Sequence, residues 1–257
     1  MEQILNAADV IPAGSVRHIV TTYTMSPALR GNAAPTLDQW FGNVQGRLTT
    51  RQTGLMGETV VLDASGIRWT AFPGTNEVLK LSGGPGDFPM LTPNRVALDS
   101  IGAGGSQPRV TGHTTVNGRA ATILELVRSW PALSDQPPGA QPGAGVAVGA
   151  VASAPGKEVF AFSRGSGSMV VAMSPQGGTV VSELVVDDQT HQILRGHAVS
   201  KDPAGNVVGT TDWAIVTDAL VDASLAPADL FVFTPAPGTT VREPAPGAPF
   251  QIRIAAP

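Results

Sequence analysis

Apolar runs of strand length alternate with turn residues along most of the chain, most regularly between residues 179 and 241. The runs are rich in β-branched residues, and clusters of Asp, Asn, Gly and Pro separate them. This pattern is typical of antiparallel strands joined by turns. The strands expected in this region are 179–186, 192–199, 207–216 and 229–238. The C-terminal third is therefore predicted to be an antiparallel meander.

The same pattern predicts hairpins upstream. Asn117-Gly118 separates two alternating runs, 109–116 and 119–127, and Asn-Gly is a strong hairpin signal because both turn positions need positive φ. A second hairpin is expected around the turn Asp63–Gly66. The other expected strands are 16–25, 40–48, 58–62, 67–72, 77–81, 158–164 and 168–174.

Helical patterns are few. Apolar residues at helical spacing predict a short helix over residues 4–11, and Thr92-Pro93 has the residues of a helix start, with an apolar stripe reaching Ile101. The Pro/Gly/Ala-rich stretch 131–157 is expected to be a mobile surface excursion rather than a strand, and 242–257 a C-terminal tail. The prediction is an α+β, β-dominated fold: one domain over 1–257, with a single large curved antiparallel sheet and short helices.

Composition excludes several classes of function. The chain has 257 residues, a net charge of −4 and no cysteine, which removes disulfides, thiolate metal sites and cysteine nucleophiles. Scattered basic residues give no electrostatic footprint for nucleic acid. No run is long enough for a transmembrane helix. The N-terminus lacks the pattern of a signal peptide. We therefore expect either a cytoplasmic protein or a chain that begins after a removed signal or anchor.

Four segments, in order, resemble the LolA-type lipoprotein carriers, a fold shared with RseB-like periplasmic sensors and mycobacterial lipid-carrying lipoproteins. VTGHTTVNGRAATILEL (110–126) is similar to the family's hairpin, and LVVDDQTHQIL (184–194) to its strand–turn–strand. DLFVFTPAPGTTV (229–241) resembles its closing segment, and LDASGIRWTAF (62–72) an upstream hairpin. The chain departs from the family at two positions. Ile193 stands where the family usually has Pro, and Val185 stands where it has Tyr or Trp.

The resemblance implies an open half-barrel whose concave side holds short helices and an apolar cavity for a lipid or lipoprotein acyl chain. It also implies an extracytoplasmic location, in the periplasm or cell envelope, and no cofactor. Burying an acyl chain contributes about 0.8 kcal/mol per methylene, so affinity needs no polar motif. The alternative within this resemblance is an RseB-like envelope-stress sensor or regulatory module that contacts a membrane-anchored protein partner.

Large aromatic side chains are the candidates for lining that cavity, and the alternative for each of them is an ordinary core residue, the more frequent role of such side chains. They are Tyr23, Trp40, Trp69, Phe160, Phe162 and Trp213. Four arginines also lie within expected strands: Arg47, Arg68, Arg119 and Arg195. We expect one of them, preferably Arg195, to be buried and to hydrogen-bond backbone carbonyls at the cavity mouth.

No catalytic or metal-binding pattern is found in the sequence. Asp187-Asp188 is interpreted as a turn rather than as a catalytic carboxylate pair. Gly165-Ser166-Gly167 lacks the spacing of a nucleophile elbow. The four histidines form no His-x-His pair, so no metal site is predicted. We therefore predict a non-enzyme, with an enzyme of unrecognised site as a third interpretation.

Overall fold

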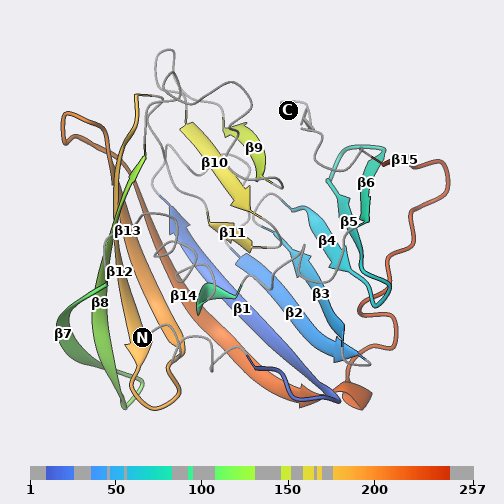
Figure 1. Ribbon diagram of the computed structural model, residues 1–257, viewed down its shortest axis with the longest axis horizontal. Coiled ribbons are helices and arrows are strands. Elements are labelled where there is room, and N and C mark those ends of the chain that lie inside the picture. The colour runs from blue at the N-terminus through green and yellow to red at the C-terminus, as the bar shows by residue number, and fades with distance from the viewer. Residues whose placement is uncertain are drawn as a thin grey trace. The chain divides into compact units, whose positions relative to one another are not determined.

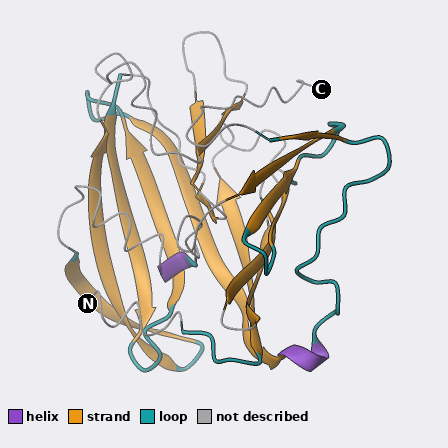
Figure 2. Ribbon diagram, turned by 45° about the vertical axis from the view of Figure 1, so that its right-hand side comes forward, coloured by secondary structure: helices purple, strands orange, loops and turns teal. Residues whose placement is uncertain are grey.

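In the residues that the computed structural model describes, nearly all of the regular secondary structure is β-strand (Figures 1 and 2). The structure describes residues 10–25, 36–44, 47–54, 57–82, 92–94, 108–130, 146–151, 159–164, 167–169 and 176–243. In these residues the helical backbone is limited to a 3-10 turn, η2 (Ala223–Leu225), and to Pro93 and Asn94. The β-dominated class is confirmed. The two predicted helices fall largely outside the described residues and are not confirmed.

Twelve strands form one hydrogen-bonded sheet in the order β15-β6-β5-β4-β3-β2-β1-β14-β13-β12-β8-β7. This order has two edge strands, so the sheet is not closed. Every pair with a described register is antiparallel except β15–β6, which is parallel and was not predicted. The strands are β1 (Ser15–Met25), β2 (Thr36–Val44), β3 (Arg47–Thr53), β4 (Thr59–Leu62), β5 (Ile67–Ala71), β6 (Glu77–Ser82), β7 (Arg109–Val116), β8 (Arg119–Trp130), β12 (Gly178–Asp187), β13 (Ile193–Lys201), β14 (Val207–Asp222) and β15 (Thr240–Arg242).

The chain divides into two compact units. Unit 1 comprises residues 1–10, 22–31 and 91–215, and unit 2 comprises 11–21, 32–90 and 216–257. Strands β7, β8, β12 and β13 belong to unit 1, and β2 to β6 and β15 belong to unit 2. The long strands β1 and β14 each contribute residues to both.

The hairpin turn in unit 2 is held by an aspartate, as predicted. The Oδ1 atom of Asp63 accepts hydrogen bonds from the backbone N–H groups of Ser65 and Ile67, and Gly66 has a φ of +83°. Burial alone would raise the pKa of Asp63, but its hydrogen bonds, including one from the Trp69 indole, lower it. The turn thereby fixes the register of β4 against β5, in which Val61 lies opposite Trp69.

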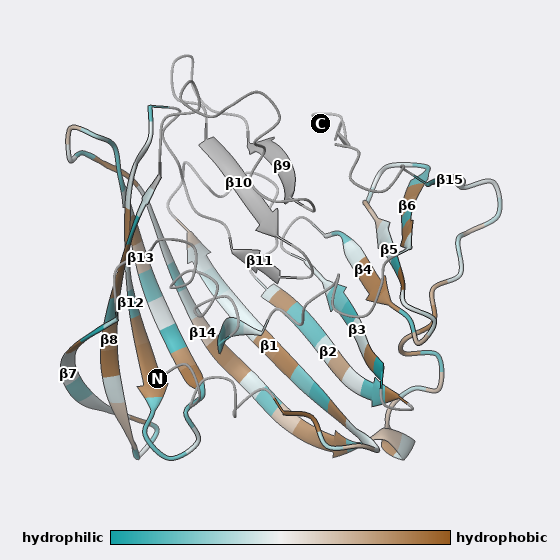
Figure 3. Cartoon of the chain, viewed as in Figure 1, coloured by the Kyte–Doolittle hydropathy of each residue, from teal (hydrophilic) through white to brown (hydrophobic). Residues whose placement is uncertain are grey.

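In unit 1 the Asn-Gly hairpin is confirmed. Asn117 and Gly118 have φ values of +51° and +79°, and the turn joins β7 to β8. Strand β8 then pairs with β12, and Leu124 lies directly opposite Leu184. The apolar residues that alternate along β8 and β12 therefore face the same side. Figure 3 marks the hydrophobic positions along both strands in brown.

A second, three-stranded sheet corrects the prediction for residues 131–157. Its order is β11-β10-β9, with β9 at Val146–Val151, β10 at Val159–Arg164 and β11 at Gly167–Met169. Strand β9 lies inside the stretch expected to contain no strand. The Pro, Gly and Ala content of the whole stretch concealed a local run with Val146, Val148 and Val151, whose β-branched side chains favour a strand.

Two other strand predictions were wrong. Residues 40–48 were expected to form one strand but belong to the hairpin β2–β3, in which Val44 pairs with Arg47. Residues 229–238 were expected to form a strand but contain turns and no strand. Pro235 and Pro237 lack the N–H group that a strand ladder needs, which explains the second error.

Candidate ligand-binding faces and pocket

An apolar cluster covers one face of β8, β12 and β13 in unit 1. Trp213 of β14 packs against it. The cross-strand register places Leu124, Leu184, Gly196 and Trp213 side by side on four neighbouring strands. The buried members of the cluster are Leu124, Leu126, Leu184, Val186 and Ile193. The face thus carries a buried apolar row with an aromatic ring at one end.

The absence of a side chain at Gly196 leaves the space that the Trp213 ring occupies in this row. A Cβ atom at position 196 would lie 2.5 Å from two atoms of the indole ring, far inside van der Waals contact. The ring therefore lies directly over the glycine backbone, and any side chain there would displace it. Sequence reasoning selected Trp213 but gave no sign of its dependence on Gly196.

The opposite face of the same strands is polar. Glu183, His197 and Asp212 are directly opposite one another on β12, β13 and β14, and His197 Nδ1 lies 2.7 Å from Asp212 Oδ1. A pocket of about 400 Å³ opens there. Its lining residues are Thr22, Thr24, Glu183, Val185, Arg195, Gly196, His197, Asp212, Trp213 and Ala214. Its exposed charges of both signs suit a polar ligand better than an acyl chain.

Arg195 lines this pocket, but its side chain is exposed. The expectation that Arg195 is buried is therefore wrong, because it lies on the solvated face of β13, next to the buried Gly196. Its hydrogen bonding to a ligand stays a prediction. Among the described residues, the buried arginines lie in unit 2 instead. Arg68 belongs to the predicted set, whereas Arg17 was missed.

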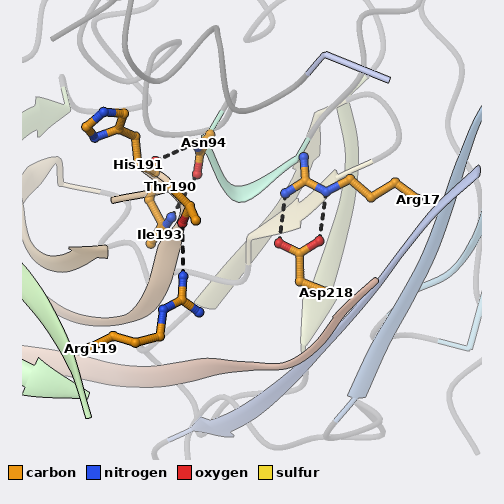
Figure 4. Close-up of polar contacts among 7 residues, drawn as sticks. All are labelled: Arg17, Asn94, Arg119, Thr190, His191, Ile193 and Asp218. Atoms are coloured by element: carbon orange, nitrogen blue, oxygen red, sulfur yellow. Dashed lines mark hydrogen bonds and ion pairs between the residues drawn. The ribbon is translucent and has the colours of Figure 1, made fainter. Parts of the chain in front are cut away.

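Arg17 and Arg68 each have an opposite charge nearby. The Arg17 guanidinium donates two hydrogen bonds to Asp218, of 2.8 and 2.9 Å (Figure 4). This bidentate geometry is the strong form of an arginine–carboxylate pair. Burial lowers the pKa of Arg68 to about 10, and attraction to the buried Glu58 carboxylate partly offsets that decrease. Both arginines therefore have a compensating carboxylate in unit 2.

The turn between β12 and β13 confirms the interpretation of Asp187. The backbone N–H groups of Gln189 and Thr190 donate to its Oδ1 atom, and Arg119 forms an ion pair with Oδ2 at 2.6 Å. Burial would raise the pKa of Asp187, but these partners lower it overall. Asn94 also donates to the His191 carbonyl and accepts from the Ile193 N–H (Figure 4). Asp187 is thus a structural turn residue.

In unit 2, Trp40 and Trp69 have partners within the chain. Trp40 stacks on His18 with ring centroids 3.7 Å apart, and Trp69 stacks on Phe233 at 5.5 Å. Phe231 occupies the space beside Gly42, where a Cβ atom would lie 2.6 Å from its ring. Residues 230–233 therefore pack against the strands that carry both tryptophans.

A row of polar side chains is buried on the other face of β2 and β3. Gln39 and Gln52 lie opposite each other, and Gln39 Nε2 donates to Gln52 Oε1 at 3.1 Å. Among the buried polar atoms of unit 2 without a hydrogen-bond partner in the described residues, three belong to this row: Gln52 Nε2, Thr50 Oγ1 and Thr21 Oγ1. Leaving a buried polar group unpaired costs about 1–3 kcal/mol, so this row needs an explanation.

The six aromatic candidates fall into three groups. Trp213 belongs to the apolar face of unit 1, and Tyr23 is a half-buried residue of β1 whose hydroxyl pKa is raised by burial. Trp40 and Trp69 belong to unit 2. Phe160 and Phe162 are on β10, and their side chains lie outside the described residues. Ligand contact stays a prediction for all six.

The described residues contain no group of three or more potential metal ligands. His18 and His197 contact Asp38 and Asp212, and His113 contacts the Thr122 hydroxyl. No helix in the described ranges is long and apolar enough to span a membrane.

No family model and no curated protein matches the chain. Among solved structures it is similar to the lipoprotein LppX of Mycobacterium tuberculosis, with 12% identity, a TM-score of 0.36, and coverage of 84% of this chain and 91% of LppX. It is similar to LprF from Mycobacterium bovis with 15% identity, the same TM-score and the same coverage. At such identities and TM-scores, the likenesses carry no further conclusion about this chain.

Proposed function

We propose that this protein binds the acyl chain of a lipid or lipoprotein in an apolar cavity and catalyses no reaction. The observation that supports this most is the apolar row on β8, β12, β13 and β14 of unit 1, which ends in the Trp213 ring over Gly196. A row of this kind can hold methylene groups without any polar contact.

The energy available is sufficient for reversible binding. About ten buried methylenes would contribute roughly 8 kcal/mol. The cost of association reduces this gross energy, so the net affinity is weaker than the micromolar value that a net ~8 kcal/mol would give, and longer chains bind more tightly. The motif resemblance to lipoprotein carriers supports the same proposal. It suggests a half-barrel with the ligand on its concave side and a location in the periplasm or cell envelope.

The proposal is tested by native mass spectrometry of the protein after gentle extraction from the cells that produce it. We expect adducts with the masses of lipids, which should decrease in Trp213→Ala because this variant removes the aromatic end of the apolar row. Lys201→Ala is the control, since Lys201 is an exposed residue of the neighbouring strand β13 that lies outside the cluster. An adduct-free spectrum for the wild type, together with no uptake of added fatty acid, would contradict the proposal.

A further inference from the structure

The buried polar row of unit 2 is a second feature that points to a ligand. Gln39, Gln52 and Thr50 share one face of β2 and β3, because Gln52 pairs with Gln39, and Thr50 pairs with Phe41 two residues further along. Thr21 lies on β1, the next strand of the sheet, and faces the same side as Gln39, because His18 of β1 stacks on Trp40 on the other side. The four side chains are only 1–2% exposed. The row is therefore not a solvated surface.

The unpaired atoms define the chemistry that would satisfy this row. Gln52 Nε2 can only donate, whereas the Thr50 and Thr21 hydroxyls can donate and accept. A hydroxyl group of a ligand can accept from the amide and donate to a threonine. A purely apolar group can do neither and would leave all three atoms unpaired.

Charge favours a neutral ligand. The buried guanidinium groups described in unit 2 already have carboxylates, Asp218 for Arg17 and Glu58 for Arg68. An ionised ligand group would enter the buried row without an opposite charge of its own, which is costly in a desolvated place. An uncharged hydroxyl-bearing group meets both requirements.

We propose that the row formed by Gln39, Gln52, Thr50 and Thr21 binds an uncharged, hydroxyl-bearing group, such as the glycerol or sugar portion of a lipid. This goes beyond the proposed function, since an acyl chain needs no hydrogen-bonding site. It rests on that function only in the choice of an acylated probe.

The chain offers a matched control on the same strand. Thr49 is buried like Thr50 and its hydroxyl also lacks a partner, but it is the adjacent residue of β3 and faces the opposite side, toward Gly42 and Phe231. Valine has nearly the shape of threonine, so Thr50→Val, Thr21→Val and Thr49→Val each remove one unpaired hydroxyl. All three variants should melt at or above the wild-type temperature.

The test compares the binding of 1-monopalmitin and methyl palmitate, which share an acyl chain and differ in two hydroxyls. We expect the wild type to prefer monopalmitin, and Thr50→Val and Thr21→Val to reduce that preference about two- to tenfold, the effect of one lost hydrogen bond. Thr49→Val should keep the wild-type preference. Free glycerol that raises the wild-type melting temperature at millimolar concentration, but not that of Thr50→Val, would support the site and identify a free polyol as its source.

Two results would overturn the inference. One is equal affinity of the wild type for both probes with no effect of glycerol, which would mean that the row holds internal water only. The other is an equal loss of preference in Thr49→Val and Thr50→Val, which would show a general effect on β3. If the wild type binds monopalmitin but not methyl palmitate, the acyl-chain function fails while this site stands.

Discussion

Replacing Gly196 by alanine tests the apolar row at its most constrained point. The added Cβ atom would lie 2.5 Å from the Trp213 ring, and carbon atoms in contact normally stay about 3.5–4.0 Å apart. The indole must therefore move by about 1 Å or more. Gly196 is buried, and its φ is not in the left-handed region, so the substitution brings no backbone strain of that kind.

The expected cost is that of overpacking a core, about 1–3 kcal/mol in the free energy of unfolding. Alanine has an intrinsic advantage over glycine within a strand of about 0.5–1 kcal/mol, which reduces the net loss. We therefore expect Gly196→Ala to lower stability by roughly 1–2 kcal/mol. It should also weaken the binding of apolar probes, because the displaced ring interrupts the row.

Urea denaturation of four proteins measures this effect: the wild type, Gly196→Ala, Trp213→Leu and the double variant. In the Trp213→Leu background the alanine should cost nothing or stabilise slightly, since the ring it would meet is gone. The reasoning is refuted if Gly196→Ala costs the same in both backgrounds. It is also refuted if Gly196→Ala leaves stability and the tryptophan fluorescence unchanged.

Three further predictions concern other contacts. Gly42→Ala should displace Phe231, and faster proteolysis after residue 222 would show that residues 230–233 have been released. Hydrogen bonds and Arg119 lower the pKa of Asp187, so its contribution to stability should be complete above the unfolded pKa of about 3.9 and should be lost as pH falls through the folded pKa. Asp187→Asn should therefore be less stable than the wild type at pH 7, and acid titration should show that its free energy of unfolding changes less with pH below about pH 4. Asp218→Asn should destabilise by about 3 kcal/mol in chemical denaturation, because it removes the carboxylate that binds the buried Arg17 guanidinium with two hydrogen bonds. A loss below about 0.5 kcal/mol would show that the pair contributes little.

Turns and hairpins were predictable because their determinants are local. Asp63 and Asn117-Gly118 act on residues within a few positions, and the structure confirms both turns. The short strand β9 was missed because the Pro, Gly and Ala content of the whole stretch 131–157 outweighed a brief run of valines within it.

The long-range contacts were not predictable from local pattern. Arg17 and Asp218 are 201 residues apart, and β15 pairs in parallel with β6 across a similarly long separation. Gln39 and Gln52 meet only because β2 and β3 form a hairpin where one strand was expected. Trp213 could be selected as a large aromatic residue, but the glycine that accommodates it depends on the register between β13 and β14.

Affinity as a function of chain length tests the central claim most directly. Titration of the protein with saturated fatty-acid methyl esters, from ten to sixteen carbons, measures the contribution of each methylene. The account predicts a dissociation constant that falls about fourfold per added methylene, equivalent to about 0.8 kcal/mol, until the cavity is filled. Affinity independent of chain length, or no binding at any length, would contradict it.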